Sequence, residues 1–165
     1  MLIAQNMTTE NNLGLREKEP TKRLSLSRFL RGYVPKLPKK DLKAIAGEFK
    51  PVKFNKGDRI VGQGEPGDAM YLITRGRAQV LFTPLGGAFG TPSEEVAILE
   101  KGALLGEMAL VFNQPRSATA VALEPVEAFS LSRDSGIYLQ ALFPAFWSQV
   151  KVVAENRQRE NQQPT

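Results

Sequence analysis

A carboxylate and a guanidinium lie nine positions apart in this chain, on either side of a short apolar segment. The segment opens with Gly106 and Glu107 and closes with Arg116. Glycine lets the backbone approach a ligand closely, and a helical turn over residues 108–112 would direct unpaired N–H groups toward an anion. Arg116 suits a phosphate, with charge-assisted hydrogen bonds of about 1.5–3 kcal/mol each. Glu107 suits a sugar hydroxyl, because a carboxylate only accepts hydrogen bonds. The pair indicates a nucleotide site.

The segment resembles the phosphate-binding cassette of cyclic nucleotide-binding domains. Such domains occur in cAMP-dependent kinase regulatory subunits, catabolite-activator proteins and cyclic-nucleotide-gated channels. Upstream runs at 56–60, 64–73 and 98–107 resemble the glycine-punctuated strands of the same family, and the resemblance spans about residues 40–157. The cassette is most similar to prokaryotic cyclic-nucleotide-gated potassium channels and kinase regulatory subunits. The resemblance implies a non-catalytic regulatory module that binds cyclic nucleotide and moves its flanking helices in response.

The resemblance also implies roles for individual residues. Glu107 would bind the ribose 2′-hydroxyl, Arg116 the cyclic phosphate, and Val80 the face of the purine. Arg157 falls where some related domains carry a residue that caps the purine, and a guanidinium stacks well on a base. The expected ligand-binding residues are Gly106, Glu107, Met108, Ala109, Arg116, Ser117, Ala118, Val80 and Arg157.

Each of these residues has a structural alternative. Arg116 in isolation would be a surface arginine, and Glu107 could cap the short helix, a role that can coexist with ribose binding. Val80 could be an ordinary core residue of its strand. Arg157 shares a helical face with Phe146, Val150 and Val153, which favours contact with the barrel, but it could also be solvated near the end of its helix.

The residue after the arginine bears on the choice of base. In the family, a threonine there tends to favour cGMP through an extra hydrogen bond to guanine. This chain has Ser117 instead, which could also be a simple solvated hydroxyl. We therefore expect cAMP as the preferred ligand, with cGMP still open.

Cysteine and histidine are both absent from the 165 residues. Disulfides, thiol nucleophiles, Ser-His-Asp triads and ordinary zinc sites are thereby excluded. We expect no catalysis, no metal and no cofactor other than the nucleotide ligand.

No apolar run reaches the 18 or so residues of a membrane span, and the opening residues do not resemble a signal peptide. A cytoplasmic location, or the cytoplasmic face of a membrane protein, is expected.

The net charge of +5 is unevenly distributed. Residues 1–50 contain 11 Lys or Arg and 5 Asp or Glu, whereas residues 51–165 contain 11 and 12. The stretch 22–43 is the most basic, and it could contact an acidic surface or membrane, nucleic acid or a partner, or be a solvated helical face. The predicted organisation is a disordered lead-in over 1–20, a basic helical segment over 21–50 and a nucleotide-binding barrel with C-terminal helices over 51–165.

Apolar spacing predicts short helices over 24–34 and 41–49, followed by a change to β periodicity. Gly-, Pro- and Asp-rich turns separate the expected strands 52–54, 59–61, 69–74, 78–82, 95–99, 118–123 and 126–131. The fold predicted is α+β and mainly β: an antiparallel, cupin-like jelly-roll barrel with an N-terminal helical bundle and a C-terminal lid helix.

Two helices are expected after the barrel, one over 132–142 and a lid helix from Pro144. Gly136 departs from the family, which usually has a large apolar residue near this position. The polar stretch from Asn156 is expected to fray.

Two other functions use the same fold. A ligand-free scaffold would use the barrel for protein contacts, although the presence of both Glu107 and Arg116 argues against it. A catabolite-activator type of transcription regulator needs a helix-turn-helix, and the 21 residues after Pro144 are too few for one. We expect a cyclic nucleotide and an effector such as a channel pore or kinase as partners, and no DNA.

Overall fold

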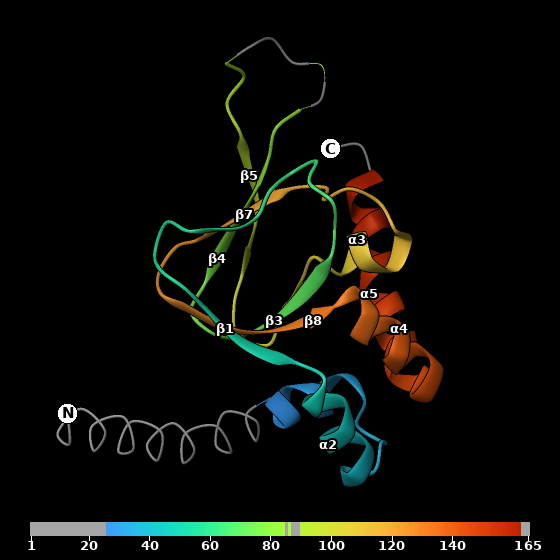
Figure 1. Cartoon of the computed structure of the whole chain (residues 1–165). Helices are drawn as coiled ribbons and strands as arrows, with labels where there is room; N and C mark the ends of the chain where they lie inside the picture. The colour runs from blue at the N-terminus through green and yellow to red at the C-terminus, as the bar shows by residue number, and fades with distance from the viewer. Residues whose placement is uncertain (1–25, 85, 87–89, 163–165) are drawn as a thin grey trace, which may run out of the picture.

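The chain folds into an antiparallel β barrel with helices packed on one side and below it (Figure 1). The computed structural model describes residues 26–84, 86 and 90–162, so the predicted lead-in over 1–20 lies outside them. The predicted fold class is confirmed. The elements are α2 Lys39–Gly47, β1 Lys50–Phe54, β2 Arg59–Val61, β3 Ala69–Arg75, β4 Ala78–Phe82, β5 Glu94–Leu99, β6 Leu104–Leu105, α3 Glu107–Phe112, β7 Thr119–Ala122, β8 Val126–Ser132, α4 Arg133–Leu142 and α5 Pro144–Gln162.

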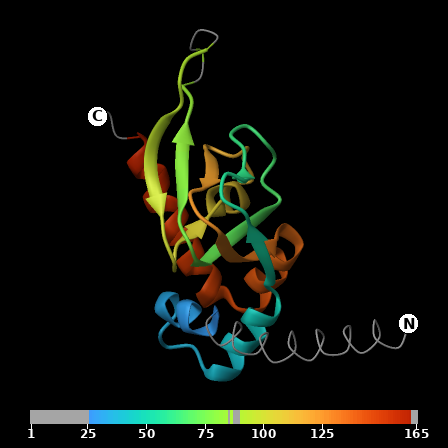
Figure 2. The same cartoon turned by 90° about the vertical axis from the view of Figure 1, so that its left-hand side faces the viewer.

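Eight strands form two four-stranded sheets with the orders β1-β8-β3-β6 and β2-β7-β4-β5. Their antiparallel pairing is that of a jelly roll, and the strand bounds lie close to the predicted ones. The two-residue strand β6 was not predicted. It pairs with Tyr71 and Leu72 of β3, and this pairing holds the start of α3 beside that strand. The β4–β5 hairpin projects away from the rest of the barrel (Figure 2).

Alternating residues of β3 and β8 face two different cores. Met70, Leu72, Phe129 and Leu131 pack on the helices, whereas Ile73, Val126 and Ala128 belong to the core between the two sheets. This is the period of two expected for strands buried on both faces. The sheet that carries β3 and β8 therefore joins the barrel interior to the helical layer.

The expected helices are present, with one correction. Residues 26–33 are helical and α2 follows, which agrees with the predictions over 24–34 and 41–49. Ser132 caps α4, because its side chain accepts a hydrogen bond from the Ser135 N–H at 3.2 Å. The fraying expected from Asn156 was wrong, since α5 continues to Gln162.

Gly136, the departure noted in the sequence, packs against the indole of Trp147. A Cβ at this glycine would lie 3.3 Å from the Trp147 ring and 3.4 Å from Leu110. The large apolar group is therefore supplied by α5 rather than by α4, and α3, α4 and α5 meet at this point. Within the described ranges, no helix is long and apolar enough to cross a bilayer.

Candidate nucleotide-binding site

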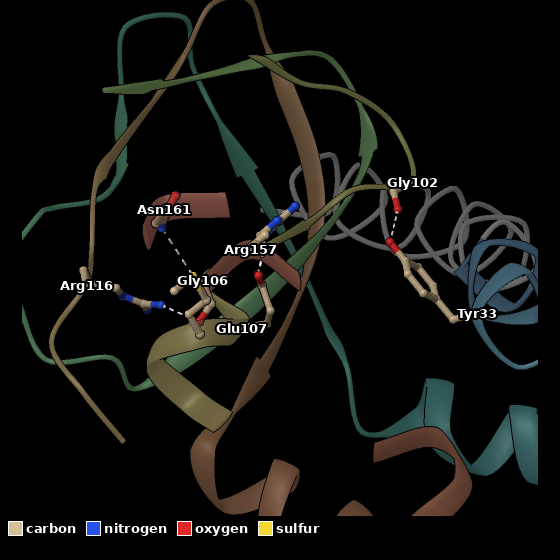
Figure 3. Close-up of polar contacts among 8 residues, drawn as sticks. Tyr33, Gly102, Gly106, Glu107, Arg116, Arg157 and Asn161 are labelled. Carbon is tan, nitrogen blue, oxygen red and sulfur yellow. Dashed lines mark hydrogen bonds and ion pairs between the residues drawn. The ribbon is translucent and has the colours of Figure 1, made fainter. Parts of the chain in front are cut away.

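Arg116 is buried, with only 6% of its surface exposed. It follows α3, and its guanidinium points back toward Gly106 at the start of that helix (Figure 3). Nη1 donates to the Gly106 carbonyl at 3.0 Å and Nη2 donates to the Ala69 carbonyl at 2.7 Å. The surface-arginine alternative is therefore wrong, and the side chain is held in one orientation by β3 and by the turn before α3.

The charge of Arg116 is only weakly neutralised. Among the described residues, the one carboxylate within 4 Å is Asp68, at 3.7 Å, and its side chain is 90% exposed. Burial lowers the pKa of the Arg116 guanidinium, while Tyr71, Asp68 and Glu65 act in the opposite direction. An arginine remains protonated in proteins despite such a shift. The site therefore contains a buried positive charge whose closest partners are neutral carbonyl groups.

The backbone around Arg116 is also fixed. Its N–H donates to the Glu65 carbonyl at 2.8 Å, and its carbonyl accepts from the Gly64 N–H at 2.9 Å. Gly106 has a φ of 80°, a left-handed conformation that strongly favours glycine. A Cβ at Gly106 would also collide with Nη1 of Arg116. This position therefore requires glycine for both its backbone and its neighbour.

Glu107, the predicted sugar ligand, is 1% exposed. Both of its carboxylate oxygens accept hydrogen bonds from Nη1 of Arg157, each at 2.7 Å (Figure 3). Arg157 comes from α5, fifty positions later, and 28% of its side chain is exposed. The structure thus joins two predicted site residues directly, and it excludes the interpretation of Arg157 as a fully solvated side chain.

The rest of α3 is covered from both sides. Ala109 packs so closely on Gly67 that a Cβ at this glycine would overlap its side chain. On the other side, the Asn161 amide Nδ2 approaches the Met108 sulfur at 4.0 Å. Sequence reasoning missed Asn161, although its position four residues after Arg157 places both on one face of α5. That spacing was the available signal.

The other predicted residues lie on the second sheet or directly before it. Val80 is half-buried on β4, where it pairs with Ala97 and Ala120. Ser117 is exposed and Ala118 half-buried, in the segment that leads into β7. Because β7 pairs with β4, these residues approach the end of β4. Contact with a purine stays a prediction for all three.

Gln63 lies in the loop before β3 and links this loop to the end of β4 and to β7. It was not singled out in the sequence. Its side-chain amide donates to the Thr83 carbonyl at 2.8 Å and accepts from the Thr83 N–H at 2.9 Å. Its own N–H donates to Oγ1 of Thr119 at 3.0 Å. The base of the β4–β5 hairpin is thereby tied to the loop before β3 and to β7.

Together these groups have the chemistry to bind an anion and a sugar hydroxyl. Arg116 supplies a buried cation, and Glu107 supplies a carboxylate acceptor at the first residue of α3. Arg133 fixes the other end of this region by donating to the carbonyls of Gly67 and Ala109, the latter at 3.3 Å. These residue types recognise a phosphorylated sugar by hydrogen bonds and charge.

Comparisons with known proteins agree with this geometry. The family model described as "Cyclic nucleotide-binding domain" matches residues 51–139, more than half of the chain. A cGMP-dependent protein kinase of Plasmodium berghei (strain Anka) is 39% identical over 80 residues, which cover 48% of this chain and 8% of the kinase. The corresponding kinase of Eimeria tenella is 38% identical over 81 residues, 49% of this chain and 7% of the kinase. The chain thus matches less than a tenth of these curated relatives.

Two solved structures show the same fold. The catabolite activator protein of Thermus thermophilus has a TM-score of 0.69 at 29% identity, over 76% of this chain and 57% of that chain. The regulatory domain of Toxoplasma gondii PKA, solved with cAMP, has a TM-score of 0.69 at 27% identity, over 84% and 51% of the two chains. With the family match over residues 51–139, these similarities show that the chain belongs to the cyclic nucleotide-binding domain family.

Proposed function

We propose that this domain is a non-catalytic sensor that binds cAMP in preference to cGMP and transmits binding to its flanking helices. The observation that carries the proposal is the buried Arg116, which is oriented by two backbone carbonyls and left without a close, buried counter-charge. Such a cation is best satisfied by an anion that enters the site. A cyclic nucleotide fits both charges of the cassette, with its phosphate on Arg116 and a ribose hydroxyl donating to Glu107.

The preference for cAMP rests on Ser117 and on one of the structural relatives. Ser117 is exposed in the segment before β7 and stands where a threonine would favour cGMP. The Toxoplasma gondii relative was solved with cAMP. The second candidate ligand is cGMP, because the Plasmodium berghei and Eimeria tenella relatives are cGMP-dependent kinases.

The proposed transmission runs through Tyr33. Its hydroxyl donates to the Gly102 carbonyl at 2.6 Å and ties the helical segment 26–33 to the turn before β6 (Figure 3). Burial raises the pKa of Tyr33, and the charges of Arg157 and Glu107 also act on it. A change at the cassette would therefore reach the N-terminal helices over a short path. A ligand can drive this movement of the helices only if it binds two states of the protein with different affinities.

The proposed output is an effector domain or protein such as a channel pore or kinase, acting without DNA. In the described part of the basic stretch, five basic side chains are exposed: Arg28, Lys36, Lys39, Lys40 and Lys43. An acidic protein surface or membrane would complement these charges. The cytoplasmic location of the protein likewise stays a prediction.

Calorimetric titration of the purified chain with cAMP and cGMP tests the ligand. We expect saturable binding of both nucleotides at micromolar concentration or tighter, with cAMP bound more tightly. Arg116→Ala should lose about 100-fold or more in affinity, because the phosphate is left without its cation. Arg75→Ala removes the same charge from an exposed position at the end of β3 and serves as the matched control.

Each result is informative. An Arg116→Ala variant that stays folded and binds like the parent would contradict the cassette assignment. Tighter binding of cGMP would replace cAMP as the ligand but leave the sensor function intact. No heat with either nucleotide, in a sample with a cooperative unfolding transition, would favour the ligand-free scaffold.

A further inference from the structure

We infer that Arg157 is an internal competitor for the sugar-binding carboxylate, so that it weakens nucleotide binding and sets how strongly the site selects for a 2′-hydroxyl. The inference rests on the proposed function, because it assumes that Glu107 receives the sugar. It assigns Arg157 an effect on affinity opposite to that of a purine cap. Whether cAMP binds more tightly or more weakly after Arg157 is removed separates the two roles.

The ion pair occupies both oxygens of the Glu107 carboxylate. Nη1 of Arg157 lies 2.7 Å from both oxygens of Glu107, so one nitrogen occupies the position between them. A sugar hydroxyl that donates to this carboxylate seeks the same oxygens. Within the described part of the chain, Arg157 makes every hydrogen bond to the Glu107 side chain.

Access to the Glu107 carboxylate is also restricted. Glu107 is 1% exposed, so a hydroxyl cannot reach it until the covering side chain moves. The cover is more than one side chain, because Asn161 lies on Met108 one helical turn further along α5. Phe146, Trp147 and Val150 of the same helix are buried in the helix-facing core. The sugar subsite is therefore covered by Arg157 at the carboxylate, and the docked helix α5 holds this arginine in place.

The free energy of nucleotide binding includes the loss of the Glu107–Arg157 contact. A nucleotide that takes Glu107 must break a charge-assisted contact to a buried carboxylate, and a neutral hydroxyl replaces only part of it. Arg157 is partly exposed, so it can leave for water at modest cost. The measured affinity is thus reduced by the fraction of molecules in which Arg157 occupies Glu107. Removal of Arg157 should raise that affinity.

The phosphate side makes the competition specific for the sugar. Arg116 is engaged by carbonyl groups and not by Arg157, so the cyclic phosphate can dock without disturbing the ion pair. A nucleotide without the 2′-hydroxyl gains nothing from Glu107 and need not displace Arg157. The competition therefore lowers the binding of cAMP more than that of 2′-deoxy-cAMP.

The test compares cAMP and 2′-deoxy-cAMP on the parent chain, Arg157→Ala and Arg157→Lys by calorimetry. Arg157→Ala should bind cAMP about tenfold more tightly and 2′-deoxy-cAMP nearly unchanged, which raises the ratio of the two affinities about tenfold. Arg157→Lys retains the charge and should stay closer to the parent. Arg159→Ala is the matched control, because Arg159 is exposed on the same helix and bonds only locally to Asn156.

Four outcomes decide the question. Tighter cAMP binding by Arg157→Ala alone, with a larger sugar ratio, supports the competitor. Weaker binding of both nucleotides by Arg157→Ala overturns it in favour of a cap. Equal tightening by Arg157→Ala and Arg159→Ala also overturns it, since a general loosening of α5 would explain both. If the parent and every variant fail to bind either nucleotide while remaining folded, the proposed function fails first and the inference with it.

Discussion

The proposed phosphate and sugar sides of the cassette lie nine positions apart in sequence and are built in opposite ways. Arg116 is buried and held by the neutral carbonyls of Gly106 and Ala69, and among the described residues the one carboxylate within 4 Å, that of Asp68, is exposed and 3.7 Å away. Glu107 is equally buried, yet it is bound at 2.7 Å by a full opposite charge from α5. The charge of Arg116 is oriented but not neutralised, whereas the charge of Glu107 is neutralised by its partner.

With the proposed function, this difference means that one short segment combines a rigid anchor with a removable contact. Carbonyl groups orient a guanidinium without cancelling its charge, so an anion gains the interaction in full. The Glu107 carboxylate is 1% exposed and covered by Arg157, so a ligand reaches it only after this side chain moves. We therefore expect affinity to depend mainly on Arg116, and the coupling between ligand and α5 to depend on Glu107.

The largest effect is expected from Arg116→Lys, which leaves the charge but removes the fork of donors. A lysine ammonium cannot reach both carbonyls and a phosphate in the same planar geometry. We expect a loss of cAMP affinity of about 100-fold, or about 3 kcal/mol, measured by calorimetry. If the affinity stayed within about threefold of the parent, charge alone would suffice and orientation would not matter.

Gly106→Ala should have the next largest effect, because the new methyl group would displace Nη1 of Arg116. The left-handed φ of 80° adds about 1–2 kcal/mol of backbone cost. We expect at least a tenfold loss of affinity together with reduced stability in a urea titration. Gly57→Ala is the control: φ is 89° and a Cβ there meets nothing within 4 Å. It should lose similar stability but retain affinity.

Glu107→Gln should change stability more than affinity. The neutral amide keeps the shape but weakens the contact to Arg157, which costs the free protein about 1–3 kcal/mol of unfolding free energy. The sugar contact and the competing contact both weaken, so the change in cAMP affinity should remain within about tenfold. Urea denaturation and calorimetry on the same sample test this. A 1000-fold loss of affinity, on the order of 4 kcal/mol, would mean that the ion pair does not oppose binding.

Tyr33→Phe removes a contact outside the cassette and should have a smaller effect. The hydrogen bond to the Gly102 carbonyl is 2.6 Å long, and its loss should lower stability by about 0.5–1.5 kcal/mol. We expect cAMP affinity to be nearly unchanged, since the hydroxyl contacts neither cassette charge directly. A large loss of affinity with the stability unaltered would show that the helix 26–33 contributes to the site itself.

Alkaline pH should produce the smallest effect. Burial raises the pKa of Tyr33 and of Tyr71 above the ordinary value of 10.0. The folded state therefore retains these protons to higher pH than the unfolded chain. Their contribution to the unfolding free energy is complete below about pH 10 and is lost as pH rises further. Unfolding free energies at about pH 9 and pH 11 should fall less in Tyr33→Phe than in the parent. An equal fall in both proteins would exclude Tyr33 as a source.

Local sequence patterns predicted most of the barrel. The strands β2 and β4 begin and end at the predicted residues, because glycine or proline turns bound them. β6 was missed since two leucines form no period by themselves, and its pairing with β3 is a long-range effect. The tail was wrongly expected to fray. Its composition is polar, but Arg157 and Asn161 anchor it to α3.

The site was predicted as a list of residues but not as a set of contacts. The types of Glu107 and Arg116 and their spacing indicated a sugar acceptor and a phosphate cation. No local pattern could show that Arg116 binds the carbonyl of Ala69, 47 positions earlier. The helical face that contains Arg157 indicated contact with the barrel. Its actual partner, Glu107, depends on how α5 crosses α3, which only the tertiary structure specifies.

The contact between Gly136 and Trp147 has an optical consequence. Trp147 is the only tryptophan of the chain, it is 7% exposed, and its ring lies against Gly136 of α4 and near Leu110 of α3. Its fluorescence is therefore a built-in reporter of the junction between the cassette and the last two helices. Any motion that separates α3 from α5 would admit water to the indole and shift its emission to the red. The unlabelled protein can thus reveal whether its helices move.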